Sequence, residues 1–403
     1  MSGRIFVTGL GVVSPLGDGV DSFWKSLCAS TEPPQEFNDS LIGACHMENR
    51  KFHRVPADWD GYGSATSADG RGNATRFALH AVEAALRDAG LDHHSPESVI
   101  GVAMGTAAGD TDAWERERSH SDGTPALQPF PFFTAPAVAS RFGLTGPNLM
   151  VSTACSAGGY GISMACDVLR SGWADVMVVG GAEAASRVTQ GCFNRLTALD
   201  PEVCRPFDID RKGTIMGEGA AVLILETEHH ALSRRRRIYA EVKGWGWSCD
   251  GHNPTAPDPS GIQAELALRR SLKGANLDPT AIDCVIPHGT GTALNDGIEG
   301  DVISRVFGIR AGTIPVTPIK SKIGHGAGAS AAFSCLAAAM ILRTGLIPPA
   351  GNLQTQDPRC RLHLPRNSAL REEVWNILIS SYAFGGNNIS LVMGKPTLWG
   401  NSP

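Results

Sequence analysis

The stretch VSTACSAGGYGISMACDVL, residues 151–169, places a cysteine immediately before a glycine-bearing helical pattern. The apolar run NLMVST predicts a strand and GYGISMACDVL predicts a helix, so Cys155 falls at the turn between them. A thiol at a helix start lies at the positive end of the helix dipole, which favours the thiolate and therefore a nucleophile. The alternative is a small buried apolar residue, which is how most intracellular cysteines behave. This stretch by itself leaves both interpretations open.

Short apolar runs alternate with alanine-rich helical patterns along the whole chain. Strands are predicted at IFVTGLGVV (5–13), VMVVGGAEA (176–184), AAVLILE (220–226), CVIPHGTGT (284–292) and NILISS (376–381), and helices at RFALHAVEAALRDAGL (76–91) and GIQAELALRRSLKGANL (261–277). Strands that alternate with helices predict an α/β protein whose sheets are covered on both faces. The polar segments 46–75 and 109–130 are weakly patterned, and we expect them to be excursions from this core.

Composition excludes several classes of function. The chain has 403 residues, a net charge of -5 and a pI near 6.2, which give no reason to expect a nucleic-acid partner. The opening MSGRIFVTGLGVV is too short and too β-like for a signal peptide or a membrane span. The ten cysteines form no CxxC pair and no Cys/His cluster at zinc spacing. We therefore expect free thiols in a reducing cytoplasm and no metal site.

An internal similarity indicates that the chain is built from two related halves. GVAMGTAAGD (101–110) resembles CVIPHGTGTALND (284–296), because each is a strand-like run that ends in Gly-Thr. Downstream, ACSAGG and VLRSG follow the first run, while GHGAGAS and ILRTG follow the second. The match places Cys155 and His325 at equivalent points of the two halves, residues 1–240 and 241–403. A duplicated α/β unit would bring these points together across an internal pseudo-dyad.

Two of the twelve histidines stand out because glycine lies beside them at the ends of predicted elements. His288 lies in PHGTGTALND, and His325 lies in IKSKIGHGAGAS. Glycine leaves room for a substrate arm to pass close to an imidazole ring. Each histidine alone is compatible with a structural role. Together with a thiol, they form the set expected of a nucleophile with acid–base or electrophilic partners.

Four motifs in a fixed order, TACSAGG, HGTGT, KSKIGH and AFGGNN, resemble those of the β-ketoacyl-[acyl carrier protein] synthases of the thiolase superfamily. The resemblance covers nearly the whole chain and includes VTGLGVVSPLG, RPFDIDRKG and MGEGAAVLILE. It implies a thiolase-like fold, with two pseudo-symmetric α/β halves in α-β-α-β-α layers. It also implies a decarboxylative Claisen condensation, in which an acyl group held on Cys155 and malonyl carrier protein give β-ketoacyl carrier protein.

The resemblance also implies a role for each residue of the site. Cys155 matches the nucleophile, His288 and His325 match the pair that binds the malonyl thioester oxygen, and Lys320 matches the active-site lysine. The backbone N–H groups of Cys155 and Phe384 match the oxyanion hole. No metal and no dissociable cofactor is implied, because both substrates arrive on the phosphopantetheine of an acyl carrier protein.

Two further sets of residues follow from the same resemblance. The acyl pocket and its gate correspond to Met104, Gly105, Phe193, Thr290, Thr292, Ala383, Phe384 and Gly385, and docking of the carrier corresponds to Arg205, Arg71 and Arg76. A dimer is implied as well, through the strand near the nucleophile. It is either a homodimer or a heterodimer with a ketosynthase-like chain-length partner.

Departures from the family pattern favour a specialised enzyme. Ser334 stands nine residues after His325, where the family usually has a glutamate. In Tyr382-Ala383-Phe384, alanine replaces the glycine of the usual GFGG loop, which predicts a stiffer gate, since alanine adopts positive φ less readily. We therefore expect polyketide or polyene biosynthesis. The alternatives are a fatty-acid elongation synthase and a non-catalytic chain-length partner.

Three other classes are disfavoured. A thiolase carries a second cysteine near the C-terminus, where this chain has AFGGNN. A nucleophile-elbow hydrolase needs GxSxG, and a P-loop enzyme needs GxxxxGK[ST]. Neither motif occurs in the chain.

Overall fold

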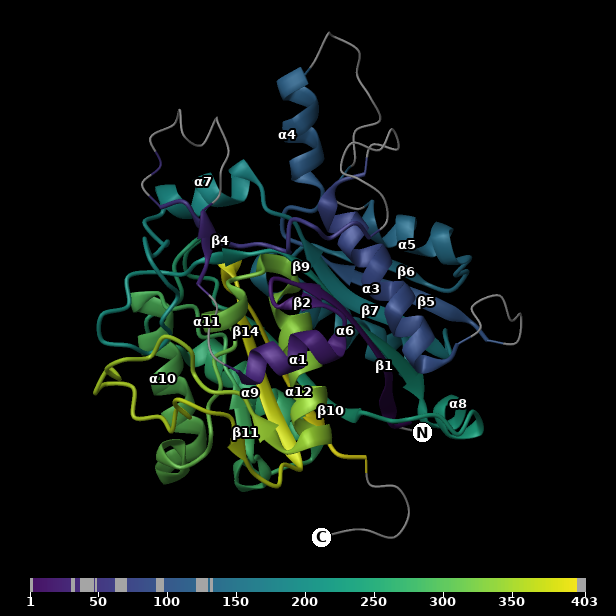
Figure 1. Cartoon of the computed structure of the whole chain (residues 1–403). Coiled ribbons are helices and arrows are strands. Elements are labelled where there is room, and N and C mark those ends of the chain that lie inside the picture. Colours follow the sequence, from purple (N-terminus) through teal and green to yellow (C-terminus); the bar gives the residue numbers. More distant parts are fainter. Residues whose placement is uncertain are drawn as a thin grey trace.

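The computed structural model describes residues 3–29, 33–36, 47, 49–61, 71–91, 98–120, 130 and 133–396 (Figure 1). Its main element is a ten-stranded mixed sheet with the order β11-β14-β15-β10-β1-β9-β7-β5-β6, in which β2 pairs with β1. The strands of this sheet are β1 (Ile5–Ser14), β2 (Gly17–Asp18), β5 (Ile100–Gly105), β6 (Asn148–Val151), β7 (Val176–Glu183), β9 (Gly219–Thr227), β10 (Ala240–Cys249), β11 (Cys284–Ile286), β14 (Asn376–Tyr382) and β15 (Asn387–Gly394). Each of the five runs predicted as strands contains a strand, but the one predicted at 284–292 ends at Ile286.

The remaining elements are helices, short 3-10 turns and two small sheets. The helices are α1 (Val20–Cys28), α3 (Asn73–Ala89), α4 (Thr111–His120), α5 (Thr134–Phe142), α6 (Ala157–Arg170), α7 (Arg187–Arg195), α8 (Glu228–Ser233), α9 (Ile262–Ala275), α10 (Ala293–Phe307), α11 (Lys320–Ile323) and α12 (Ser330–Thr344). The 3-10 turns are η1 (Ala154–Ser156), η2 (Pro279–Ala281), η3 (Gly308–Gly312), η4 (Ala327–Ala329) and η5 (Phe384–Gly386). The small sheets join β3 (Gln35–Glu36), β4 (Lys51–His53) and β8 (Met216–Gly217), and β12 (Leu346–Ile347) with β13 (Leu370–Arg371).

The two halves of the large sheet meet at β1 and β10. These strands pair over only two positions, Phe6 with Glu241 and Val7 with Ala240. In the first half β5 pairs in parallel with both β6 and β7, and in the second half β11 pairs in parallel with β14. Parallel strands covered by helices are the arrangement expected of an α/β protein.

The protein has five layers, and three hydrophobic clusters fill the spaces between them. On β7, Val176 and Val178 pack with α3 and α5, whereas Met177 and Val179 pack with α6 and α12. The reason is that successive side chains of a strand point to opposite faces. On β14, Leu378 packs with α9 and α10, while its two neighbours join the core of α6 and α12. The layers are α3/α5, sheet, α6/α12, sheet and α9/α10 (Figure 1), which confirms the predicted α-β-α-β-α order.

The central helix layer brings the two related halves together. The turn η1 leads into α6, the turn η4 leads into α12, and the two turns pack against each other. Each turn begins with an alanine at positive φ, Ala154 at 50° and Ala327 at 39°. Non-glycine residues rarely adopt this region, and strain of this kind concentrates at functional sites. The internal similarity predicted that the regions around Cys155 and His325 come together, and the packing of η1 against η4 agrees with that prediction.

One helical stretch, Ala327–Thr344, is long and apolar enough to cross a membrane. It comprises η4 and α12, and it is almost entirely buried between the layers of the protein. Such a helix is explained by its place in the core, because a helix that is apolar on all sides is buried.

The polar segments 46–75 and 109–130 lie only in part within the described residues. Their described parts contain β4 and α4. The rest of both segments lies outside the residues that the structure describes, as do residues 397–403.

Candidate active site

Cys155 lies in η1, between the end of β6 and the start of α6, as the sequence predicts. The turn directs its side chain into a cluster of apolar residues that includes Phe52, Phe193 and Met216. Only 5% of Cys155 is exposed. The Ser381 hydroxyl donates a 3.1 Å hydrogen bond to the Cys155 carbonyl oxygen, which ties the turn to β14. Cys155 is therefore buried in an apolar cluster, and it also lines a cavity of the protein.

Burial raises the pKa of the Cys155 thiol to about 12. The Lys320 charge and the Phe384 backbone N–H act in the opposite direction. The sequence left open a thiolate nucleophile and a buried apolar residue at Cys155, and burial acts against the effect of the helix start. A thiol in an apolar environment stays protonated, because charge is costly there.

His288 follows β11, and a buried carboxylate holds its backbone. The N–H groups of His288 and Gly289 each donate a 2.7 Å hydrogen bond to Glu299 of α10. Burial raises the pKa of Glu299 to about 7. Glu299 therefore holds the backbone N–H groups of His288 and Gly289 in place.

Lys320, at the start of α11, contacts His288 twice. Its Nζ donates a 2.5 Å hydrogen bond to the His288 carbonyl oxygen and lies 3.4 Å from His288 Nδ1. Burial, together with the Lys320 charge, lowers the pKa of His288 well below its usual value. The ring is neutral at pH 7, and a donor at Nδ1 requires the ring proton to be on Nε2.

His325 has the same tautomer for a different reason. Its Nδ1 accepts a 3.1 Å hydrogen bond from the Ala327 N–H and lies 2.9 Å from the Ser330 hydroxyl. Burial and the Lys320 charge lower its pKa well below the usual value. The rings of His288 and His325 are 5.5 Å apart between centroids and nearly perpendicular. Two neutral imidazoles therefore share one site, each with an Nε2–H donor.

A cavity of about 390 Å³ contains this site. Cys155, His288 and His325 line it together, whereas Lys320 reaches it only through His288. The ring of Phe193 stacks on Phe384 at 5.3 Å between centroids. Of the predicted pocket and gate residues, the cavity is lined by Phe193, Thr290, Thr292, Ala383 and Phe384.

Met104, Gly105 and Gly385 do not line this cavity, so the prediction for them needs correction. Met104 is fully buried in the core beneath α3. Gly105 lies so close to the start of α6 that a Cβ atom would be 2.3 Å from the Gly158 nitrogen. Gly385 lies in η5 and has a φ of 82°. Its role is conformational, since few residues other than glycine adopt this φ.

The expectation that Ala383 makes the gate stiffer stays a prediction, and in this structure Ala383 needs no positive φ. Ala383 has a φ of -139°, which is extended backbone that any residue adopts. The positive φ angles of this loop belong to Gly385 and Gly386. Ser334, the other departure, is buried within α12.

The structure does not support a docking surface made of Arg205, Arg71 and Arg76. Arg76 is buried in α3, donates to Asn73 and to the Gly61 carbonyl, and lies over the Trp59 ring. Arg205 is mostly buried and forms ion pairs with Asp200 and Glu202. Arg71 is half-buried just before α3 and is not among the residues that line the cavity. The guanidinium groups of Arg76 and Arg205 contact groups of this chain.

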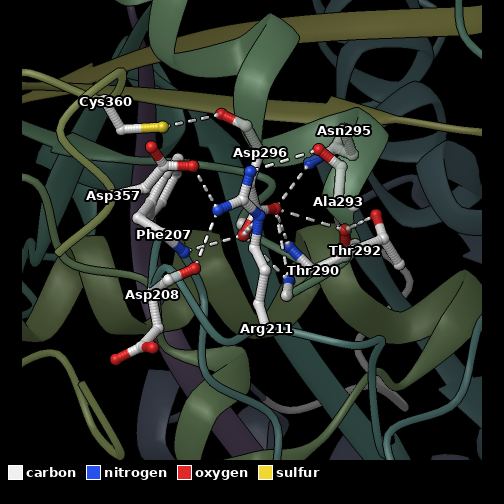
Figure 2. Close-up of polar contacts among 12 residues, drawn as sticks. Phe207, Asp208, Arg211, Thr290, Thr292, Ala293, Asn295, Asp296, Asp357 and Cys360 are labelled. Carbon is white, nitrogen blue, oxygen red and sulfur yellow. Dashed lines mark hydrogen bonds and ion pairs between the residues drawn. The ribbon is translucent and has the colours of Figure 1, made fainter. Parts of the chain in front are cut away.

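Sequence reasoning missed a buried polar network beneath the cavity (Figure 2). Asp296 accepts hydrogen bonds from the backbone N–H groups of Phe207 and Thr290, at 2.8 and 3.1 Å. Arg211 donates to Asp357 at 2.7 Å and lies 4.0 Å from Asp296. The ALND that follows HGTGT was the available signal, since a carboxylate near a helix start is positioned to accept backbone N–H groups.

Glu183, at the end of β7, is a second missed carboxylate. It accepts hydrogen bonds from the N–H groups of Ala107, Ala108, Gly109 and Gly328, at 2.8 to 3.1 Å. Gly328 belongs to η4, so one side chain holds loops from both halves of the chain. Among the described residues, no group of three His, Cys, Asp or Glu residues could hold a metal ion.

Two family models match most of the chain. The β-ketoacyl synthase N-terminal domain matches residues 2–231, and the β-ketoacyl synthase C-terminal domain matches residues 239–354. The chain belongs to the β-ketoacyl synthase family. This confirms the predicted family and shows that the protein is an enzyme, a β-ketoacyl synthase of the acyltransferase class.

Two named relatives of this β-ketoacyl synthase match almost its whole length. It is 34% identical over 417 residues to the tetracenomycin polyketide synthase ketoacyl synthase alpha subunit of Streptomyces glaucescens, covering 98% of this chain and 97% of that one. It is 32% identical over 412 residues to the 3-oxoacyl-[acyl-carrier-protein] synthase 2 of Coxiella burnetii, covering 97% and 98%.

Solved structures agree with the fold of this β-ketoacyl synthase. The ishigamide ketosynthase/chain length factor matches with a TM-score of 0.89 and 33% identity, covering 98% of this chain and 99% of that chain. A type II polyketide ketosynthase in complex with its acyl-carrier protein, AntDE:AntF, matches with a TM-score of 0.88 and 27% identity, covering 98% and 100%. The predicted thiolase-like fold is confirmed.

Proposed function

We propose that Cys155 carries the acyl group in this β-ketoacyl synthase and that His288 and His325 stabilise the attacking enolate. One observation carries the proposal. The thiol and both imidazoles line the same cavity. Both rings are neutral, their Nδ1 atoms are held by Lys320 and by the Ala327 N–H, and each ring therefore carries its proton on Nε2. This combination supplies a nucleophile and two donors for a developing oxyanion.

In the first step the Cys155 sulfur attacks the carbonyl carbon of a carrier-bound acyl thioester. The new C–S bond forms as the old one breaks, and the cysteine proton ends on the departing carrier thiol. The N–H groups of Cys155 and Phe384 act as the oxyanion hole. Phe384 lines the same cavity as Cys155 and belongs to the same apolar cluster, which supports this role.

In the second step a malonyl thioester loses its carboxylate as carbon dioxide, and the electron pair moves onto the thioester oxygen. The two Nε2–H groups stabilise that negative charge, which lowers the barrier by a few kcal/mol in sites of this kind. The enolate carbon then attacks the acyl carbon, the bond to Cys155 breaks, and the thiol regains a proton. Thr290 and Thr292, whose hydroxyls are 2.8 Å apart at the cavity wall, bind the arm of the incoming substrate.

The pathway in this proposal is specialised polyketide or polyene biosynthesis. Support comes from the polyketide names of the relatives and from Ser334, which replaces a usual glutamate. The substrates arrive on acyl carrier protein, so no metal or dissociable cofactor takes part. A cytoplasmic location fits the cysteines of the described residues, all of which are free. Residues 1–240 form the half with the nucleophile, and residues 241–403 form the half with both histidines.

The partner in the dimer is a homologous chain, and we favour a chain-length partner over a second copy. The strand β6 is an edge of the large sheet, and its residues Asn148, Leu149 and Met150 are exposed or half-buried. An edge strand offers unpaired backbone groups to another chain. The structural neighbour that is a ketosynthase/chain length factor supports a heterodimer.

The experiment is intact-mass analysis of the purified chain after incubation with acyl-carrier thioesters of several lengths. A gain of one acyl mass in the wild type, lost in Cys155→Ala and kept in Cys192→Ala, is expected. Cys192 is an exposed thiol and serves as the matched control. An acyl gain that survives in Cys155→Ala would overturn the nucleophile assignment. Repetition with a co-expressed homologue tests whether acyl transfer needs the partner chain.

A further inference from the structure

A second cavity, of about 440 Å³, lies beside α11. Its walls come from the end of α1, from the segment that contains Arg205, from the loop 349–354 and from Arg366. Among the described residues, it shares no lining residue with the Cys155 cavity. Cavities of this volume are typical of sites for small molecules. The reaction at Cys155 makes no use of this second cavity.

Lys322 of α11 lines the second cavity, although only 1% of this residue is exposed. Its ammonium donates to the carbonyl oxygen of Leu27, at 2.8 Å, and to that of Ala29, at the end of α1. An ammonium carries three protons, so one donor remains after these two hydrogen bonds. Within the described residues, Lys322 forms no ion pair with a carboxylate. Burial lowers the pKa of Lys322 to about 8, as expected for a cation whose charge is only partly compensated.

Arg366 brings a second cation to the same cavity. Its guanidinium lies 3.4 Å from the Gln354 carbonyl oxygen and 3.4 Å from the Gln356 amide oxygen, and it has no carboxylate partner in the described part of the chain. Glu202 lines the cavity as well, but Arg205 matches its charge at 3.2 Å. The cavity therefore presents two cations, Lys322 and Arg366, that no described carboxylate balances.

Hydrogen bonds hold the walls of this cavity in place. The Asn352 side chain donates to the carbonyl oxygens of Cys204 and Ser321, both at 2.9 Å. The Gly351 N–H donates to the Ser321 hydroxyl at 3.0 Å. Ser321 directly precedes Lys322, so the backbone that carries the buried ammonium is fixed against two other segments. Binding to a preformed site of this kind costs little ordering entropy.

We propose that this cavity binds a small anion with two carboxylate or phosphate groups, one beside Lys322 and one beside Arg366. A small molecule is favoured over a protein surface because Lys322 is recessed and can be reached only from within the cavity. Two anionic groups are needed to balance two cations, and a guanidinium binds carboxylate and phosphate equally well through its planar fork. The site lies outside the catalytic machinery, and the inference does not depend on the reaction at Cys155.

Isothermal titration calorimetry of the full chain, at pH 7 and constant ionic strength, tests this site. Succinate and pyrophosphate carry two anionic groups, whereas acetate and inorganic phosphate carry one. Saturable binding of succinate or pyrophosphate is expected, about tenfold tighter than that of the matching single-group anion, and the tighter of the two identifies the anionic group. Lys322→Met is expected to weaken this binding about tenfold, because a charge-assisted hydrogen bond in a recessed site is lost. Arg366→Gln is expected to weaken it about fivefold, as for an exposed ion pair.

Matched controls lie away from this cavity. Lys243→Met removes a half-buried lysine that donates to Asn376, and Arg371→Gln removes an exposed arginine of β13. Both variants are expected to bind the anion with the affinity of the wild type.

Two results would overturn the proposal. If neither succinate nor pyrophosphate binds the wild type, Lys322 only caps the C-terminal end of α1, where a cation is favoured. If binding persists unchanged in both Lys322→Met and Arg366→Gln, the anion lies elsewhere on the molecule. Should Lys322→Met fail to fold, Arg366→Gln decides alone, because Arg366 is exposed.

Discussion

The Lys320 ammonium donates a 2.5 Å hydrogen bond to the His288 carbonyl oxygen and lies 3.4 Å from Nδ1 of the same residue. One side chain thus fixes the backbone, the ring and the tautomer of His288. The Lys320 charge also lowers the pKa values of both His288 and His325. Burial is the larger cause of both shifts, and we interpret Lys320 as a positioning residue that adds to it and so helps to keep the two imidazoles neutral.

Replacement of Lys320 by methionine tests this interpretation. Because the charge that lowers both histidine pKa values is removed, the acid limb of the kcat/KM profile is expected to move to higher pH. The maximal rate is expected to fall about 100-fold, as when a preorganised donor to an oxyanion is lost. The measurement is a pH–rate profile of malonyl decarboxylation. Lys322→Met is the control, because within the described residues the Lys322 ammonium donates to the carbonyls of Leu27 and Ala29 and not to either histidine. An acid limb at the wild-type pH in Lys320→Met would refute the electrostatic part of the argument.

Alkylation of Cys155 decides between two opposing effects on its thiol. Burial raises the pKa of this thiol to about 12, while the helix start favours the thiolate. If burial dominates, the rate of alkylation by iodoacetamide rises about tenfold per pH unit from pH 7 to pH 9, because only the thiolate reacts. Peptide mass spectrometry follows Cys155 and, as an internal reference, the exposed Cys192. A plateau between pH 7 and pH 8 would show that the helix start outweighs burial.

The alternation of strands and helices predicted sheets covered on both faces, and the family resemblance supplied the order of the layers. Strands such as VMVVGGAEA have no polar face, which requires a helix layer on each side. The internal similarity also predicted the contact between the two turns that lead into α6 and α12. Both inferences depend on features that repeat along the chain.

The carboxylates beneath the site could not be predicted in the same way. Glu183 and Glu299 are isolated acids in the sequence, and their partners are mainly backbone N–H groups that leave no sequence signal, whereas Asp296 had a signal in its place near a helix start. Arg76 was misassigned for a related reason. An arginine on a helix looks exposed until the packing of that helix is known, and here Trp59 covers it.

Glu183→Gln is expected to destabilise the protein and to lower its activity together. The four backbone N–H groups that point at the carboxylate would face a side chain that is itself a donor at one end. We expect a loss of about 2–4 kcal/mol in the free energy of unfolding, which is typical when buried donors lose their acceptor. Urea unfolding at pH 7 measures the loss. The control is Glu228→Gln, at a partly exposed ion pair with Arg4, where about 0.5 kcal/mol is expected. Equal effects of the two substitutions would contradict the role of Glu183.

His53 provides a pH dependence that is independent of catalysis. It lies in β4, it is buried, its Nε2 has no hydrogen-bond partner within the described residues, and burial lowers its pKa to about 4. Above pH 6.5 the histidine is neutral in the folded and unfolded chains and contributes no slope. Between pH 6.5 and pH 4 the unfolded chain binds a proton that the folded chain does not, so stability falls as the pH falls. His53→Gln should remove about 1.4 kcal/mol per pH unit of this loss. Urea unfolding of both proteins at pH 7.5, 5.5 and 4.5 makes the comparison, and parallel stability curves would mean that His53 is protonated in the folded chain.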